Sequence, residues 1–425
     1  MRQGFEFYLA SLRGDLERPA EADAVRFFQR DAPETLDIPR AADRREEPTA
    51  VAFERMPLDE SFAVEDPAIA SMLPRGDGGE ILATDMRSGA IWRWRFTAGV
   101  VAADVVARAE HPCRLVPWPA EGPDAYLLAD LGSYLPQDHD AGRVVAVDLA
   151  TGTQRVLAAG LGRVVEAQPL GRVGDGGDDI IVAEFGWRQT GSLRRLRREA
   201  AGGYAAEVFD PRHGALGVRI TDLDGDGVRD VVAAFGQEYE TVEVWWGRDD
   251  GGFDHERILT LPDPSWGSST FELADLDGDG RLDVLHANGD TLDSGLAKPY
   301  HGIRRIMNRG DRRFEAEEIG RMVGGCHAVA GDLDGDGDAD VVACSLYRLA
   351  PNFPAGTFDS IVWYEWRDGG YLPHVIERDT CDHAGLVLAD VDHDGRLDVI
   401  AGTLRGKATG TRLPPATVYL NRPRP

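Results

Sequence analysis

A nine-residue acidic motif recurs four times along this 425-residue chain. Each copy reads Asp-x-Asp-x-Asp-Gly-x-x-Asp and runs directly into a short apolar stretch, such as Val-Val-Ala at 231–233. Short apolar runs that follow a glycine-containing turn are typical of buried strands. The motif therefore marks a repeating unit in which an acidic turn leads into an interior strand. The copies begin at Asp222, Asp275, Asp332 and Asp390.

Weaker copies of the same unit lie upstream, where a single acidic residue precedes an apolar stretch. Together with the final acids of the four full motifs, they mark seven units spaced by 44 to 58 residues. A repeat of this length that alternates apolar strands with turns predicts one four-stranded propeller blade for each unit. The sequence thus predicts an all-β chain, a seven-bladed β-propeller. The seven acids are Glu80, Asp124, Asp179, Asp230, Asp283, Asp340 and Asp398.

The last unit lacks an outer strand, because the chain ends soon after the aromatic strand at 417–420. The segment at about 49–58 has the composition of the missing strand, so we expect it to close the seventh blade as an N-terminal latch. Closure of this kind protects the sheet edges of a propeller. We therefore assign 49–425 to the propeller and 1–48 to an N-terminal helical segment and linker, based on the helical spacing of apolar residues from Phe5 to Leu16.

The clustered carboxylates of each full motif repel one another, so the loops require a cation, and hard oxygen ligands select Ca²⁺ or Mg²⁺. Side chains at positions 1, 3, 5 and 9 with a backbone carbonyl at position 7 suit the flexible shell of Ca²⁺. An EF-hand is excluded, because position 12 is never Glu and the flanks are strand-like. We expect about four calcium ions. The predicted ligands are Asp222, Asp224, Asp226, Val228 and Asp230; Asp275, Asp277, Asp279, Arg281 and Asp283; Asp332, Asp334, Asp336, Asp338 and Asp340; and Asp390, Asp392, Asp394, Arg396 and Asp398.

These four loops resemble the FG-GAP/VCBS repeats of integrin α-subunit propellers and of many secreted bacterial proteins. The resemblance covers roughly residues 49–421. It implies a calcium-binding propeller whose calcium loops join the first and second strands of a blade, and it leaves the activity open, because this fold hosts many functions. Long second loops, at 131–142, 288–300, 346–358 and 403–415, are then expected on the opposite face. Long loops on a rigid scaffold are usual places for function.

The innermost strand of each blade precedes the acidic loop, so its channel-facing residue can be found by counting back along the sequence. Counting five residues back from the first loop position of each unit selects His111, Glu166 and His327 as channel residues, with His383 nearby. Two imidazoles and a carboxylate could bind a transition metal such as Zn²⁺, or a histidine and Tyr300 could act as acid and base. The alternative to a binding propeller is therefore a metal-dependent lyase or dehydratase that acts on a sugar or polysaccharide. Ordinary polar residues at a wet channel explain the same pattern.

The charge balance constrains the partners. Lys and Arg number 46 and Asp and Glu 73, a net charge of −27, which argues against nucleic acid and anionic membranes. No run is apolar and long enough for a transmembrane helix. We expect a monomer that binds a carbohydrate or protein ligand. Weak calcium sites would fill only outside the cytoplasm, so we also expect a periplasmic or secreted protein whose export signal does not lie in this chain. Cys326 and Cys381 begin equivalent strands, which leaves a disulfide or two free thiols open.

Overall fold

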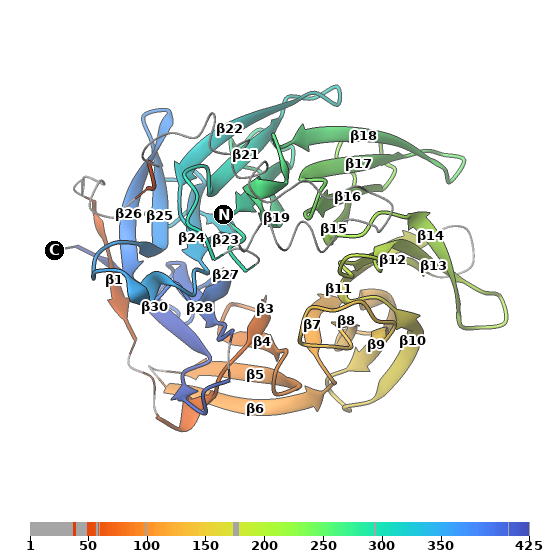
Figure 1. Ribbon diagram of the computed structural model, residues 1–425, viewed down its shortest axis with the longest axis horizontal. Coiled ribbons are helices and arrows are strands. Elements are labelled where there is room, and N and C mark those ends of the chain that lie inside the picture. The colour runs from red at the N-terminus through yellow and green to blue at the C-terminus, as the bar shows by residue number, and fades with distance from the viewer. Residues whose placement is uncertain are drawn as a thin grey trace, which may run out of the picture.

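The computed structural model describes residues 37–39, 49–56, 58, 60–97, 100–172, 178–292, 295–406 and 408–424. These residues form seven four-stranded antiparallel sheets arranged in a ring, as Figure 1 shows in a view down the ring axis. The predicted seven-bladed β-propeller is thus confirmed. The predicted helices between Phe5 and Gln29 and most of the 1–48 segment lie outside the described residues.

Each of the first six blades is one continuous stretch of chain, with its first strand next to the axis. Blade 1 comprises β3 (Ile69–Arg75), β4 (Glu80–Asp85), β5 (Ala90–Thr97) and β6 (Val100–Arg108). Blade 2 comprises β7 (Pro112–Pro117), β8 (Ala125–Asp130), β9 (Gly142–Asp148) and β10 (Gln154–Leu161). Blade 3 comprises β11 (Val164–Arg172), β12 (Asp178–Glu184), β13 (Ser192–Arg198) and β14 (Tyr204–Asp210).

The blades that carry the full acidic motifs follow in order. Blade 4 comprises β15 (Ala215–Thr221), β16 (Asp230–Phe235), β17 (Thr241–Gly247) and β18 (Phe253–Thr260). Blade 5 comprises β19 (Ser268–Ala274), β20 (Asp283–Asn288), β21 (Gly302–Asn308) and β22 (Phe314–Arg321). Blade 6 comprises β23 (Gly325–Gly331), β24 (Asp340–Ser345), β25 (Asp359–Arg367) and β26 (Gly370–Arg378). Blade 7 comprises β27 (His383–Ala389), β28 (Asp398–Thr403), β30 (Ala416–Pro423) and β1 (Val51–Arg55).

The apolar stretches after the acidic motifs form the second strand of each blade, and this strand is sandwiched between neighbouring blades. Every residue of β16, β20, β24 and β28 is buried. Successive side chains point to opposite faces of a strand, so such a strand contacts both adjacent blades and must be apolar on both faces. The core consists accordingly of clusters between adjacent blades, as where Val284 of blade 5 packs with Val232 and Trp246 of blade 4.

Strands from both ends of the described chain share blade 7. β1 pairs antiparallel with β30, with Val51 opposite Pro423 and Arg55 opposite Tyr419. Val51 is buried, and the ring of Phe53 meets that of Trp363 edge to face at 5.8 Å. A two-stranded sheet of β2 (Val64–Glu65) and β29 (Arg412–Leu413) adds a second link between the two ends.

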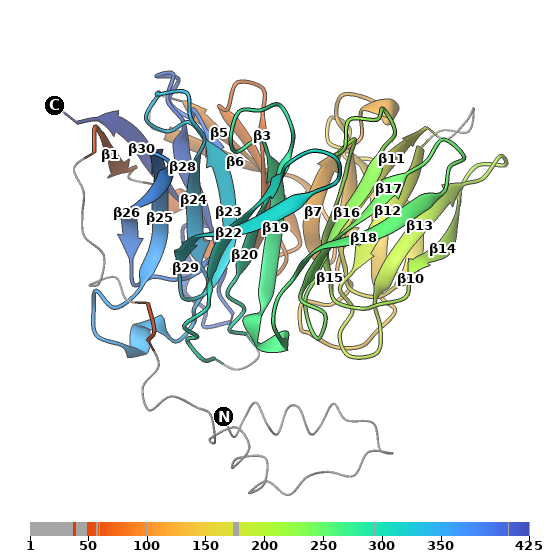
Figure 2. The same ribbon diagram turned by 90° about the horizontal axis from the view of Figure 1, so that it is seen from above.

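Two faces of the disc carry different connections (Figure 2). The turns between the first and second strands, which hold the acidic motifs, lie on one face, called here the calcium-loop face. The connections between second and third strands and those between blades lie on the other, called the long-loop face. The remaining elements are short 3-10 helices, and within the described part of the chain no helix is long and apolar enough to span a membrane. They are η2 (Glu60–Phe62), η3 (Pro119–Glu121), η4 (Pro264–Trp266) and η5 (Ala350–Asn352).

Candidate calcium loops and the central channel

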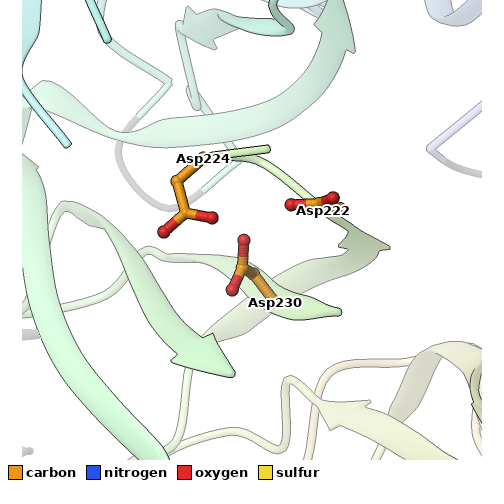
Figure 3. Close-up of side chains that lie close together, drawn as sticks. All are labelled: Asp222, Asp224 and Asp230. Carbon is orange, nitrogen blue, oxygen red and sulfur yellow. The ribbon is translucent and has the colours of Figure 1, made fainter. Parts of the chain in front are cut away.

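In each full motif the first aspartate organises the turn. Both carboxylate oxygens of Asp222 accept backbone hydrogen bonds, from Gly225 N at 2.8 Å and from Gly227 N at 2.9 Å. Gly225 and Gly227 have φ of 78° and 90°, a left-handed conformation that favours glycine. The turn folds the later aspartates back over the first, as Figure 3 shows for Asp222, Asp224 and Asp230. The alternating aspartates and the glycines therefore act together to gather carboxylates.

The aspartate at position 9 begins the second strand and is fully buried in blade 4. Asp230 accepts hydrogen bonds from Leu223 N at 2.8 Å and from Gly247 N at 2.7 Å, which fixes the loop to the third strand. Burial and the neighbouring carboxylates raise the pKa of Asp230 to about 6, and the same causes raise the pKa of Asp340 to about 7. Without a cation, a buried carboxylate beside other carboxylates is destabilised in its charged form.

The donor set fits calcium. In each loop, three aspartates place one oxygen each within 4.8 Å of the others. In the fourth loop, Asp392 Oδ1 is buried without a hydrogen-bond partner, which a cation would satisfy. Carboxylates alone, with no nitrogen or sulfur donor, suit a hard cation. The backbone carbonyls at position 7 stay a prediction. The groups are Asp222, Asp224 and Asp230; Asp275, Asp277 and Asp279; Asp332, Asp334 and Asp336; and Asp390, Asp392 and Asp398.

Arginines from the third strand and the following turn neutralise part of the charge in three of the four loops. Arg312 of blade 5 lies 2.7 Å from Asp224 of blade 4, and Arg422 lies 2.5 Å from Asp392 within blade 7. Arg309 approaches Asp277 at 3.3 Å. Among the described ion pairs, none involves the Asp332–Asp340 loop, so its carboxylates are the least neutralised by arginine.

Blades 1 to 3 lack the full motif, and in these blades arginines pair with the acids at the start of the second strand. Arg75 pairs with Glu80 at 2.9 Å and with Asp124 at 2.8 Å. Asp179 pairs with Arg195 at 2.7 Å. The acid that begins the second strand is therefore charge-compensated in these blades without a metal.

A layer of paired charges crosses the central channel. The innermost strands line a cavity of about 450 Å³. Arg219 lies 2.5 Å from Glu166 and 2.8 Å from Glu272, and Arg114 approaches the same two glutamates at 3.3 and 3.5 Å. His327 contacts Glu272 at 3.2 Å. Although burial opposes it, the charge of Arg219 holds the pKa of Glu272 well below its ordinary value.

The structure brings together only part of the predicted channel set. Glu166 and His327 line the cavity, but His111 does not. The first strands of blades 2 and 3 both have a register shift near their start, and Arg114 and Glu166 are the first paired residues after it. Arg114 therefore occupies the position in blade 2 that Glu166 occupies in blade 3. Placing His111 at the channel was wrong, since blade 2 has no calcium loop from which its register could be counted. His111 Nδ1 instead donates to the Met86 carbonyl at 2.7 Å.

The remaining predicted residues lie elsewhere. His383 is buried beside Glu377 at 3.4 Å, and Tyr300 stacks on Trp266 at 4.9 Å on the long-loop face; neither lines the cavity. Among the described residues, groups able to hold a metal occur at the four aspartate loops and not at the channel. Cys326 and Cys381 are free thiols, and burial raises their pKa to about 12 and about 11.

Sequence reasoning missed Arg114, Arg219 and Glu272, which carry most of the channel charge. Arg219 and Glu272 lie two residues beyond the positions that the count selects in blades 4 and 5, Gly217 and Thr270. On a strand, residues two apart share a face, so the count could have been extended to them. Position alone does not reveal the pairing, because Arg219 reaches Glu166 and Glu272 across blade boundaries.

Replacement of Arg219 by Gln should destabilise the fold by about 3 kcal/mol, because it leaves buried Glu166 without its closest partner. The depressed pKa of Glu272 means that this stabilisation is complete above about pH 4.5 and is lost as the pH falls through the folded-state pKa. Urea unfolding at pH 7 measures the effect. Arg313→Gln is the matched control, since the Arg313 side chain is 70% exposed. If both variants change the free energy of unfolding equally, the ion pairs of the channel do not stabilise the fold more than an exposed arginine does.

Comparison with known proteins supports the repeat assignment. Residues 222–286, which contain two of the four loops, match the family model of the FG-GAP-like repeat. The resemblance drawn from the sequence is thereby confirmed for that segment. No curated protein matches the chain.

Similar solved structures include three of low sequence identity. The N-terminal domain of Nup159 aligns with a TM-score of 0.48 at 10% identity, over 90% of this chain and 98% of that one. The WD40 domain of Toxoplasma gondii coronin gives 0.47 at 12% identity, over 91% and 88%. The Dos1 propeller gives 0.46 at 9% identity, over 83% and 78%. Likenesses at this level carry no functional argument.

Proposed function

We propose that the chain is a calcium-stabilised binding propeller that presents its long-loop face to a carbohydrate or protein ligand outside the cytoplasm. This proposal rests mainly on one observation: hydrogen bonds between adjacent blades hold the long loops of that face in place. Asp138 of blade 2 accepts hydrogen bonds from the backbone of Gln189 and Thr190 of blade 3 at 2.9 and 3.0 Å. Thr291 of blade 5 donates to the Leu346 carbonyl of blade 6 at 3.2 Å. Ordered loops on a rigid ring suit recognition.

Exposed apolar side chains on the same face support a binding role. Leu292 and Leu296 on the β20–β21 loop are 47% and 48% exposed, and Leu349 and Phe353 on the β24–β25 loop are 41% and 44% exposed. Apolar side chains gathered on an otherwise polar surface often mark interaction sites. The lyase alternative has no comparable support, because the channel glutamates are already ion-paired to arginine.

A panel of immobilised neutral and acidic polysaccharides tests the proposal. We expect at least one to bind the full chain, and we expect Leu349→Ala with Phe353→Ala to weaken that binding about fivefold or more. Val156→Ala with Val208→Ala is the matched control, because these outer-strand residues are 53% and 57% exposed on the rim. The carbohydrate form of the proposal fails if no polymer binds, or if both pairs of substitutions have the same effect.

A further inference from the structure

Several arginines lie on the connections of the long-loop face, although the chain as a whole carries a net charge of −27. Each comes from a different blade. Arg87, Arg348 and Arg405 lie on the connections between second and third strands of blades 1, 6 and 7, and Arg163 lies on the connection that enters blade 3. The strong overall negative charge makes this local collection of guanidinium groups a feature to be explained.

Three of these side chains meet at one loop of blade 7. Arg87 donates to the Tyr134 hydroxyl at 2.7 Å and to the Arg405 carbonyl, and its guanidinium lies 4.8 Å from the Tyr134 ring centroid. The Tyr134 hydroxyl also donates to the Arg405 carbonyl, at 3.0 Å. Arg348 is adjacent, because a Cβ on Gly406 would lie 2.5 Å from its side chain. Blades 1, 2, 6 and 7 thus contribute to one surface.

Imidazoles extend this surface toward blade 3. The His111 ring lies 6.4 Å from the Tyr134 ring. His139 lies on the same connection of blade 2 as Tyr134. Burial and the positive charge of Arg163 lower the pKa of His139, while Asp140 and Asp138 oppose this shift. The result is an arc of cationic and aromatic side chains, called here the arginine arc. Its members are Arg87, Arg163, Arg348, Arg405, Tyr134 and His139.

Most arginines of the arc form no described ion pair, although Asp290 interacts electrostatically with Arg348, and Asp138 and Asp140 with His139. Within the described chain, no carboxylate forms an ion pair with Arg87, Arg163 or Arg348, whereas Arg405 has Asp382 at 3.3 Å. The Nε atoms of Arg87 and Arg163 are buried without a hydrogen-bond partner. Burial lowers the pKa of Arg163, and the Cys113 thiol opposes this shift. Unpaired buried donors are costly, and a guanidinium group without a carboxylate partner can pair through its other N–H groups with an oxyanion.

We infer that the arginine arc binds the acidic groups, carboxylate or sulfate, of an anionic polysaccharide. The inference rests on the proposed binding function and names its ligand class. The guanidinium groups extend over several blades instead of converging on one pocket, which suits an extended polymer with regularly spaced charges. Planar guanidinium forks match carboxylate and sulfate oxygens, and Tyr134 offers a ring among them. The acidic remainder of the surface opposes polyanions elsewhere, so recognition is confined to the arc.

Binding of the full chain to four immobilised probes at about 0.15 M salt tests this inference. Polygalacturonate presents carboxylates, heparin presents sulfates, dextran is neutral and poly-glutamate is an acidic peptide. We expect polygalacturonate or heparin to bind at least about tenfold more tightly than dextran and poly-glutamate, and the tighter of the two identifies the acidic group. Arg163→Gln with Arg348→Gln should weaken that binding about tenfold.

The matched control is Arg248→Gln with Arg313→Gln, which removes the same charge from exposed turns on the calcium-loop face and should change binding less than about twofold. Unchanged melting curves show that both double variants fold. Dextran binding as tightly as the acidic polymers would overturn the inference and leave the proposed function standing. Equal binding of poly-glutamate, with the same loss in the arc variant, would replace the polysaccharide by an acidic peptide. Absence of binding to every polymer here and in the wider panel would overturn this inference together with the carbohydrate form of the proposed function.

Discussion

Removal of calcium by excess EGTA is expected to lower the melting temperature by at least about 10 °C. A ligand that binds only the folded state stabilises it by about 2.7 kcal/mol when present at one hundred times its dissociation constant. Four such sites contribute on the order of 11 kcal/mol. The buried Asp340, whose loop forms no described ion pair, also loses its only proposed counter-charge when the ion leaves. Differential scanning calorimetry with and without chelator measures the shift.

Re-addition of calcium is the control, and it should restore the original melting curve. Four ions would also change the formal net charge from −27 to −19, so the chelated protein should gain stability from added salt more than the calcium-loaded protein does. A melting curve that excess chelator leaves unmoved would show that the acidic loops do not depend on a cation.

Deletion of residues 1–58 is expected to destabilise the protein far more than deletion of residues 1–45. Only the longer deletion removes β1, whose Val51 is 2% exposed, and it leaves the edge of β30 unpaired. It also removes Met56, which packs into the core between blades 7 and 1. We expect the longer deletion to lower the melting temperature by about 10 °C or more, or to abolish the cooperative transition.

The shorter deletion serves as the control for loss of N-terminal chain. It removes the Asp37 ion pair with Arg321 and the packing of Ile38, both at the surface of blades 5 and 6, and should shift the transition by only a few degrees. Thermal unfolding and size-exclusion chromatography compare the two proteins. Indistinguishable stability would show that the β1–β30 pairing does not hold the ring closed.

Much of the fold could be predicted because each repeat combines an acidic motif with an apolar strand that follows it directly in the sequence. The acidic residue that ends each motif falls at or beside the first residue of a second strand, as Asp230 does for β16 and Asp398 for β28. The apolar stretch after it is uniformly buried, so composition and position agree. Periodicity of this kind depends on neighbours along the chain, which the sequence displays directly.

Contacts between distant segments could not be predicted in the same way. Arg312 reaches Asp224 across 88 positions, and Arg219 links two glutamates from neighbouring blades. The register of blade 2 could not be counted without a calcium loop, so the sequence argument selected His111 where the structure places Arg114. The arginine arc could not be predicted from the sequence, because its members lie on separate loops that the fold alone brings to the same face.

Calcium titration of the full, metal-free chain by isothermal calorimetry tests the central claim most directly. We predict about four sites, with dissociation constants of about 10⁻⁴–10⁻³ M if the protein works outside the cytoplasm. Asp334→Ala should remove one site, because Asp334 is a predicted ligand and its loop has no arginine among the described ion pairs. Asp249→Ala, on an exposed turn of the same face, should remove none. Dissociation constants below about 10⁻⁷ M would withdraw the argument for export. Absence of calcium binding would contradict the account of the loops.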